Sequence, residues 1–109
     1  MKTSYFAKYR GDKGVSIAAK APPGFKGETY PALYPKWSFL GRYKEDGDED
    51  KYTKAYYDEV LSKLDPEKVY ADLKGKVLLC WERSGSFCHR RIVAEWLERQ
   101  LEVGIPECD

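Results

Sequence analysis

The residues best suited to chemistry gather in one short stretch, 80–91. It holds the only histidine of the chain, His89, next to Cys88, with Cys80 and the carboxylate of Glu82 a few residues earlier. A thiol at the start of a helix beside a histidine and an arginine has a lowered pKa, which favours a nucleophilic thiolate. Carboxylates and imidazoles are common general acids and bases. Glu82, His89 and Cys88 are therefore the candidate catalytic residues.

The same stretch predicts a site for an anion. A small polar turn over 83–87 precedes the expected helix, and Ser86 is placed to cap it. The first turn of a helix presents unpaired N–H groups and the positive end of the helix dipole, which together bind anions. The planar donors of Arg90 match two anionic oxygens. The candidate ligand-binding residues are Arg90, Ser84, Ser86, Cys80 and Tyr5.

Each candidate also has a structural interpretation. Cys88 fits a half-buried structural cysteine, and His89 fits a group that caps the helix or orients a ligand. Glu82 suits a general base or a ligand of a ribose hydroxyl, but equally a salt-bridge partner of Arg83 or Arg90. The sequence leaves these alternatives open.

A metal site is the third alternative. Cys80, Cys88, His89 and Cys108 offer enough zinc ligands, but none of the familiar paired spacings occurs, and adjacent Cys and His side chains rarely point at one ion. We therefore predict neither a metal nor another cofactor. A disulfide between Cys80 and Cys88 remains an alternative product of oxidation.

Length and composition fit one compact domain over 1–109. The chain has 19 Lys and Arg against 18 Asp and Glu, a net charge of +1, and 42% hydrophobic residues. No run of about 18 apolar residues exists to span a membrane, and the first residues lack the apolar core of a signal peptide. Three cysteines, an odd number without close pairing, favour a reducing cytoplasm.

The charge is unevenly distributed along the chain. Residues 1–44 carry nine Lys and Arg against two Asp and Glu, a net charge of +7, whereas residues 45–73 carry four against ten, a net charge of −6. A basic first part suits a phosphate-bearing ligand, but the acidic run Glu45–Asp50 can screen it. Ordinary solvated surface is the alternative interpretation of both blocks.

Hydrophobic periodicity predicts the elements that position these residues. Alternating and apolar runs predict strands over 3–9, 15–18 and 76–81, the last one central and buried on both faces. Helical spacing predicts a helix over 53–64, with Thr53 as cap, and a second over 66–74, with Asp65 as cap and Pro66 as its first residue. A third helix is predicted over 87–102, closed by Gly104 and Pro106. The segment 22–44 is expected to be a long ordered loop with one short helix. This order of strands and helices indicates a small layered α/β fold with a largely parallel sheet and a ligand outside the carboxyl ends of the strands.

A family resemblance rests on the same motifs. Leu79-Cys80-Trp81-Glu82, followed by Cys88-His89-Arg90 and Ala94-Glu95-Trp96-Leu97, resembles the C-terminal signature of domain-of-unknown-function family 488 (DUF488). The segments similar to its compact prokaryotic and viral branch are Thr3–Phe6, Val15–Ile17, Pro31–Pro35, Tyr43-Lys44, Tyr52–Tyr56 and Glu107. The resemblance implies a Rossmann-like domain with a polar site where the motifs meet. The expected fold is thus a small Rossmann-like three-layer α/β domain with a short, largely parallel sheet.

These observations predict a protein that binds a phosphorylated small molecule, as a nucleotide or nucleic-acid component, where strand 76–81 meets helix 87–102. As an enzyme it would hydrolyse a glycosidic or phosphate bond. The alternatives are a non-catalytic module that binds or sequesters nucleotides, and a small interaction protein that forms a homodimer through exposed aromatic residues. Tyr5, Tyr30 and Trp37 are candidates for stacking on a base, with core packing as the alternative. No membrane partner is expected.

Overall fold

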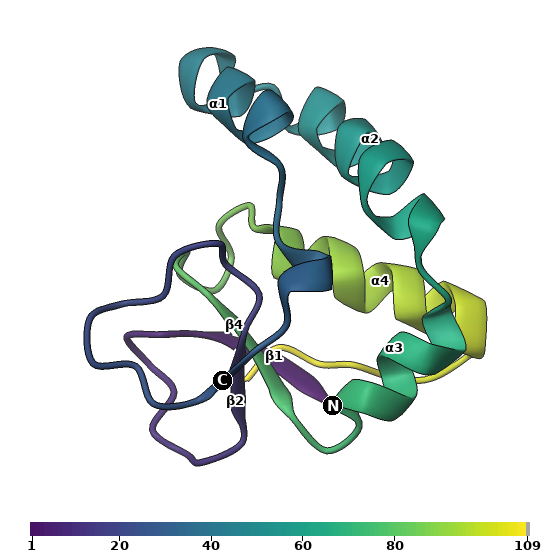
Figure 1. Cartoon of the computed structure of the whole chain (residues 1–109). Helices are drawn as coiled ribbons and strands as arrows, with labels where there is room; N and C mark the ends of the chain where they lie inside the picture. Colours follow the sequence, from purple (N-terminus) through teal and green to yellow (C-terminus); the bar gives the residue numbers. More distant parts are fainter. Residues whose placement is uncertain (109) are drawn as a thin grey trace.

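The computed structural model describes residues 1–108 and is built around a parallel four-stranded sheet with the strand order β1-β4-β2-β3 (Figure 1). The strands are β1 (Lys2–Tyr5), β2 (Gly14–Ser16), β3 (Glu28–Thr29) and β4 (Val77–Cys80). All four residues of β4 are buried, as the continuous apolar run predicts for a strand covered on both faces. The α/β class, the parallel sheet and the central position of β4 are confirmed.

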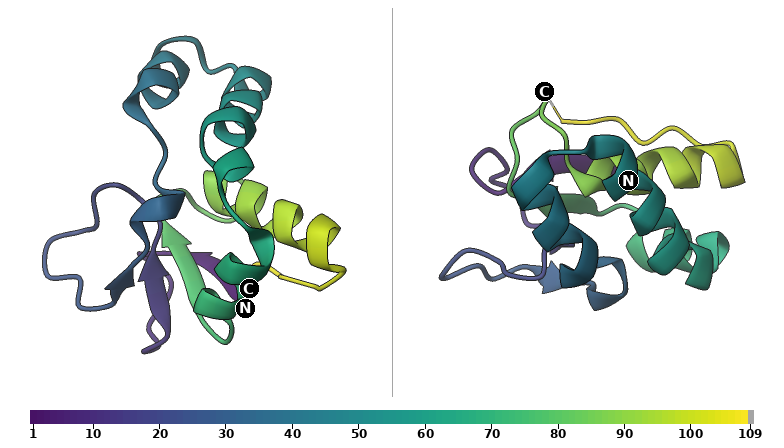
Figure 2. Two further views of the ribbon diagram at one scale, coloured as in Figure 1. Left: turned by 45° about the vertical axis from the view of Figure 1, so that its right-hand side comes forward. Right: turned by 90° about the horizontal axis from the view of Figure 1, so that it is seen from above.

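The helices lie in two places relative to the sheet. α3 (Pro66–Leu73) and α4 (His89–Leu101) contact each other, and α4 runs along β1 and β4. α1 (Trp37–Asp46) and α2 (Glu49–Glu59) form a pair that stands beyond one end of the strands (Figures 1 and 2). Two 3₁₀ turns, η1 (Pro31–Leu33) and η2 (Leu61–Lys63), join them to the rest. Among residues 1–108, no helix is long and apolar enough to cross a membrane.

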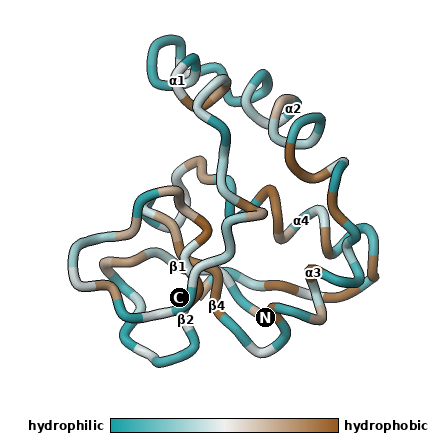
Figure 3. Tube along the Cα trace, viewed as in Figure 1, coloured by the Kyte–Doolittle hydropathy of each residue, from teal (hydrophilic) through white to brown (hydrophobic). Residues whose placement is uncertain are grey.

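The core lies between the sheet and α4. Hydrophobic residues gather along β4 and on one side of α4, whereas α1 is largely hydrophilic (Figure 3). Val15 and Leu78 are neighbours in the sheet and belong to the same buried cluster as Val93 and Leu97 of α4. Burial of these apolar residues of α4 holds the helix against β4. The position of the first residues of α4 is fixed in this way.

The acidic run forms the turn between α1 and α2. Gly47 ends α1 with a φ of 64°, a left-handed conformation that glycine adopts without steric cost. The Asp46 side chain accepts from the amide of Asp48, and Asp48 caps α2 by accepting from the amide of Lys51 at 3.1 Å. The prediction that Thr53 caps this helix is therefore wrong, because Asp48 already caps the helix and α2 begins at Glu49.

Other boundaries also differ from the predicted ones. β1 stops at Tyr5 rather than at residue 9, because the amides of Lys8 and Tyr9 turn back to the carbonyl of Tyr5. The helix predicted over 87–102 spans 89–101, and the residue after it, Glu102, adopts a left-handed φ of 54° ahead of the predicted glycine stop. By contrast, α3 begins as predicted, with Asp65 as its cap.

The segment predicted as a long loop is more regular than expected and is tied to α2. It contains β3, η1 and most of α1. The hydroxyl of Tyr56, a residue with no solvent exposure, donates to the carbonyl of Leu33 at 2.7 Å. This contact joins residues far apart in the sequence, so no local pattern reveals it.

We expect the Tyr56→Phe substitution to lower the free energy of unfolding by about 1–2 kcal/mol, because the buried carbonyl of Leu33 loses its donor. Tyr57→Phe, on the partly exposed side of the same helix, is the matched control and should change it by less than about 0.5 kcal/mol. Urea unfolding of both variants measures the difference. Equal effects of the two substitutions would contradict the role given to the Tyr56 hydroxyl.

Candidate functional site

A pocket of about 480 Å³ lies at the carboxyl ends of β2 and β4. These two strands are neighbours, but the chain leaves them in opposite directions. After β2 it continues towards β3, and after β4 it returns through α4 to pair Glu107 beside Thr3 of β1. Ligands of open parallel sheets bind at such a divergence. The pocket therefore occupies the place that the strand order singles out.

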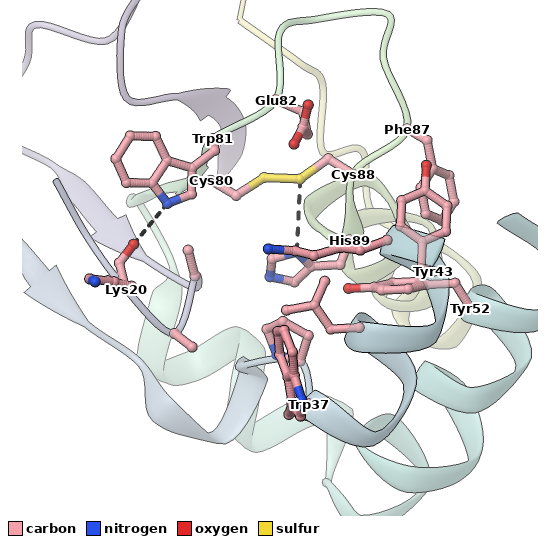
Figure 4. A pocket seen from close by; sticks show the side chains of 15 residues that line it. Lys20, Trp37, Tyr43, Tyr52, Cys80, Trp81, Glu82, Phe87, Cys88 and His89 are labelled. Atoms are coloured by element: carbon pink, nitrogen blue, oxygen red, sulfur yellow. Dashed lines mark hydrogen bonds between the residues drawn. A yellow bond between two sulfur atoms is a disulfide. The ribbon is translucent and has the colours of Figure 1, made fainter. Parts of the chain in front are cut away.

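The walls of the pocket are largely aromatic (Figure 4). Trp37 of α1 and Trp81, directly after β4, both line it, with 69% and 51% of their surface exposed. The indole N–H of Trp81 donates to the carbonyl of Lys20 at 2.8 Å, and the ammonium of Lys44 lies 5.6 Å from the centre of the Trp37 ring. Glu82 is the exposed carboxylate on this lining. The rim thus combines flat apolar surfaces with two cations and one anion.

The buried end of the pocket holds the two cysteines, which are joined by a disulfide (Figure 4). Cys80 ends β4 and Cys88 is the residue before α4, and both are more than nine-tenths buried. The expectation that the cysteines have no close pairing is therefore wrong, because the loop between them folds back over the end of the strand. Cys108 is the remaining, free cysteine.

His89 is buried and its two ring nitrogens have different surroundings. Nε2 lies 2.7 Å from the carbonyl of Ile17, so it carries the proton and donates it. Nδ1 is then unprotonated and faces the sulfur of Cys88 at 3.8 Å. Burial lowers the pKa of His89 to about 4; the hydrogen bond to the Ile17 carbonyl opposes this shift, and the neighbouring charge of Arg90 adds a smaller lowering. His89 is accordingly a neutral lone-pair donor at pH 7.

Arg90 lies below the pocket, and four of its five N–H donors are already occupied. The guanidinium is 1% exposed and forms a two-pronged ion pair with Glu107, with N···O distances of 3.0 and 2.7 Å. Nη1 also donates to the sulfur of Cys80 at 3.0 Å and to the backbone carbonyl of Glu82 at 2.7 Å. The Tyr5 ring lies 5.8 Å away. Arg90 and Tyr5 thus belong to a buried network rather than to the pocket lining.

The two serines of the turn also differ from the expectation. Ser84 donates to Glu107 and so joins the Arg90 network. Ser86 does not cap α4: the cap position is Cys88, and no side chain bonds there. The prediction of Ser86 as a cap is wrong because the helix starts two residues later than its pattern suggests. Of the predicted site residues, the structure brings four to the pocket, namely Cys80, Glu82, Cys88 and His89.

The pocket lining also includes residues that were not predicted as site residues, among them Trp81, Lys20 and Lys44. Trp81 and Lys20 follow the ends of two adjacent parallel strands, so applying the carboxyl-end rule to β2 as well as to β4 would have found them. Lys44 comes from α1, whose position over the sheet no local signal reveals. Trp37, expected as one of three stacking residues, does line the pocket, whereas Tyr30 donates to Asp72 and is not part of the lining.

Fold and site together define an α/β protein with a pocket at the divergence of two parallel strands. A sequence model of a protein family, described as the active DUF488-N3 subclade (DUF488-N3a), matches residues 7–101. The chain belongs to the DUF488 family. The similar segments at Thr3–Phe6 and Glu107 lie outside the matched residues. No curated protein and no solved structure gives a significant match.

We expect the stability of the fold to fall in acid through Glu107. Burial by itself raises the pKa of this carboxyl, but hydrogen bonds from Arg90, Ser84 and Thr3 outweigh it and lower the pKa to about 2. A lowered folded-state pKa gives stability that is present above the ordinary pKa of about 4.3 and is lost as the pH falls towards 2. Glu107→Gln should flatten this part of the pH profile and cost about 3 kcal/mol at pH 7, because it removes the anion from a buried guanidinium.

Glu95→Gln is the control, since Glu95 is exposed on the same helix that carries Arg90. Denaturant unfolding from pH 7 to pH 2 measures both variants. An acid loss of stability that is as steep in Glu107→Gln as in the natural protein would contradict the assignment.

Alkylation should report the state of the cysteines. Without reductant, the folded protein should take up one alkyl group, on Cys108, because the other two sulfurs share a bond. After reduction and unfolding, all three cysteines should react. Intact mass followed by peptide mapping reads both numbers. Labelling of Cys80 or Cys88 without reductant would contradict the disulfide.

Proposed function

We propose that the pocket binds a phosphorylated ligand with a planar base, either a nucleotide or a base at a nucleic-acid end. The observation that carries the proposal is the pair of exposed indoles, Trp37 and Trp81, on the lining of one pocket. Exposed apolar surfaces that gather in one groove are typical of ligand-binding sites, and each indole presents a face on which a base stacks. The volume of about 480 Å³ lies within the roughly 300–1,000 Å³ typical of small-molecule sites.

The charges on the rim support an anionic group on this ligand. Lys20 and Lys44 are exposed and line the pocket, against the single carboxylate of Glu82. A lysine ammonium binds phosphate as a point charge on a flexible stem and needs no fixed geometry. We assign the phosphate to these lysines rather than to Arg90, because the guanidinium already donates to Glu107, Cys80 and the backbone.

Hydrolysis of the bound ligand is the second candidate function, and Glu82 favours it. Its exposed carboxylate is the one acidic side chain of the lining and follows β4 directly, within reach of a ligand in the pocket. A carboxylate there would accept a proton from an attacking water. The neutral His89 would orient rather than protonate, and the sulfur of Cys88 becomes a nucleophile only after its disulfide is reduced.

Ligand binding is tested by calorimetric titration with a panel of mononucleotides and with inorganic phosphate. We expect Trp81→Ala to weaken binding of a mononucleotide at least about 5-fold, because stacking on an aromatic ring contributes roughly 1–3 kcal/mol per base. Lys44→Ala should weaken it at low salt, and Lys54→Ala, which removes an exposed lysine from α2, should not. Saturable binding that all three substitutions leave unchanged would place the ligand elsewhere.

The absence of any nucleotide binding would contradict the proposal itself. In that case a concentration-dependent dimer mass that is lost on Trp37→Ala would support the interaction protein with an aromatic homodimer face instead.

Turnover is tested separately with Glu82→Gln. If the protein is a hydrolase, this variant should lose product formation by at least about 100-fold and keep its ligand affinity, since general base catalysis contributes roughly 10²–10⁴-fold. Chromatographic detection of free base and free phosphate distinguishes a glycosidic from a phosphate bond. Binding without any product from the natural protein would support a non-catalytic module.

A further inference from the structure

We propose that the reduced protein binds one thiolate-preferring divalent metal ion, such as Zn²⁺, through the sulfurs of Cys80 and Cys88 and Nδ1 of His89. The three ligand atoms lie within 4.8 Å of one another, and all three residues are buried. They come from the end of β4 and the start of α4, which the core packing holds together (Figure 4). The proposal goes beyond ligand binding and does not depend on it.

The spacing of the donors fits a tetrahedral ion. Zinc–sulfur and zinc–nitrogen bonds of about 2.3 and 2.0–2.1 Å place two ligand atoms ~3.6 Å apart. The sulfur of Cys88 lies 3.8 Å from Nδ1 of His89, although the two residues are adjacent in the chain. The sequence-based expectation that such neighbours do not point at one ion does not hold for this pair, because the helix begins between them and turns both side chains inwards.

The backbone leaves room for the ion between the two cysteines. Their Cα atoms are 7.4 Å apart, whereas disulfide-linked cysteines are usually about 4.4–6.8 Å apart. In a tetrahedral zinc site, two thiolates lie ~3.8 Å from each other. Once the S–S bond is reduced, small rotations of both side chains bring the sulfurs to this separation without bringing the chain segments closer.

Hydrogen bonds around the three residues already orient two of the proposed ligands for a metal ion. Metal-bound histidines usually donate their second ring N–H to a carbonyl or carboxylate, which fixes the ring and leaves the other nitrogen free for the metal. His89 does so through Nε2 and the carbonyl of Ile17, at 2.7 Å. The guanidinium of Arg90 donates to the sulfur of Cys80 at 3.0 Å and favours its thiolate form. Nδ1 of His89 and the sulfur of Cys80 are thus already oriented to bind the metal.

Metal binding takes place in two steps, reduction of the disulfide and coordination of the ion. A phosphine reductant gives two electrons to the disulfide and takes up the oxygen of one water molecule to become a phosphine oxide, while the two protons of that water complete the two thiols. The divalent ion then replaces the two thiol protons, which are released to solvent. Three protein ligands leave a fourth position, and the pocket lined by the same residues is open to a water or a ligand there. Three protein ligands with an open position are typical of catalytic zinc.

The experiment titrates the phosphine-reduced protein with Co²⁺ and with Zn²⁺ in the absence of nucleotide. We expect one ion per chain, thiolate-to-cobalt charge-transfer absorption in the near ultraviolet, and displacement of Co²⁺ by Zn²⁺. Cys88→Ser and Cys80→Ser should each weaken binding by at least the roughly 10- to 100-fold known for outer-shell partners alone. Cys108→Ser, which removes the free cysteine, should bind like the natural protein.

The oxidised natural protein gives a comparison that does not depend on how a variant folds. Its sulfurs are shared in the disulfide, so it should bind no ion, and reduction should restore binding. Equal binding by oxidised protein, unchanged binding in Cys80→Ser, or no binding after reduction would each overturn the proposal. Because no nucleotide is present, these outcomes leave the proposed ligand binding untouched.

Discussion

The burial of one guanidinium constrains most of this structure. Arg90 is 1% exposed, and a charge so deep in a small protein is tolerated only when it is paired and its donors are satisfied. Glu107 supplies the opposite charge, while Cys80 and the carbonyl of Glu82 accept the remaining bonds. The chain must therefore bring its C-terminal segment back beside β1, where Thr3 donates to the same carboxylate at 2.6 Å.

The constraint on Arg90 reaches the pocket through its neighbours in the chain. His89 and Cys88 immediately precede it, so fixing Arg90 fixes the side from which they approach the end of β4. From the other side, aromatic rings of α2 close over them: Tyr52 packs edge-on against Phe87, and Tyr56 lies 5.6 Å from the His89 ring. The site is thus held between a buried ion pair below and an aromatic cluster above.

The parts of the fold that the sequence reveals are those set by local chemistry. The apolar run of β4 and the Asp-Pro start of α3 are such signals, and the structure confirms both. The helix pair over 37–59 was missed in part. Its turn depends on hydrogen bonds to two aspartate side chains, and its position depends on the hydrogen bond from the Tyr56 hydroxyl to the Leu33 carbonyl. Long-range contacts of this kind leave no periodicity in the sequence.

The same distinction applies to the candidate site. The residues of the 80–91 stretch could be found because they are contiguous and follow a buried strand. Arg90 is the instructive exception: its type and position suit an anion, but its partner Glu107 becomes a neighbour only when the chain returns to β1. Lys20 and Lys44 come from separate segments, and only the assembled sheet and α1 place them on one rim.

The central claim, that the ends of β2 and β4 form one ligand pocket with α1, is tested most directly by ¹H–¹⁵N correlation spectra recorded during a mononucleotide titration. The chain has three tryptophans, of which Trp96 lies in the core. We predict saturable shifts of the Trp37 and Trp81 indole N–H signals, with one common dissociation constant, and an unchanged Trp96 signal. Shifts confined to Trp96 or to residues of α3, or no shift at any indole, would contradict the claim.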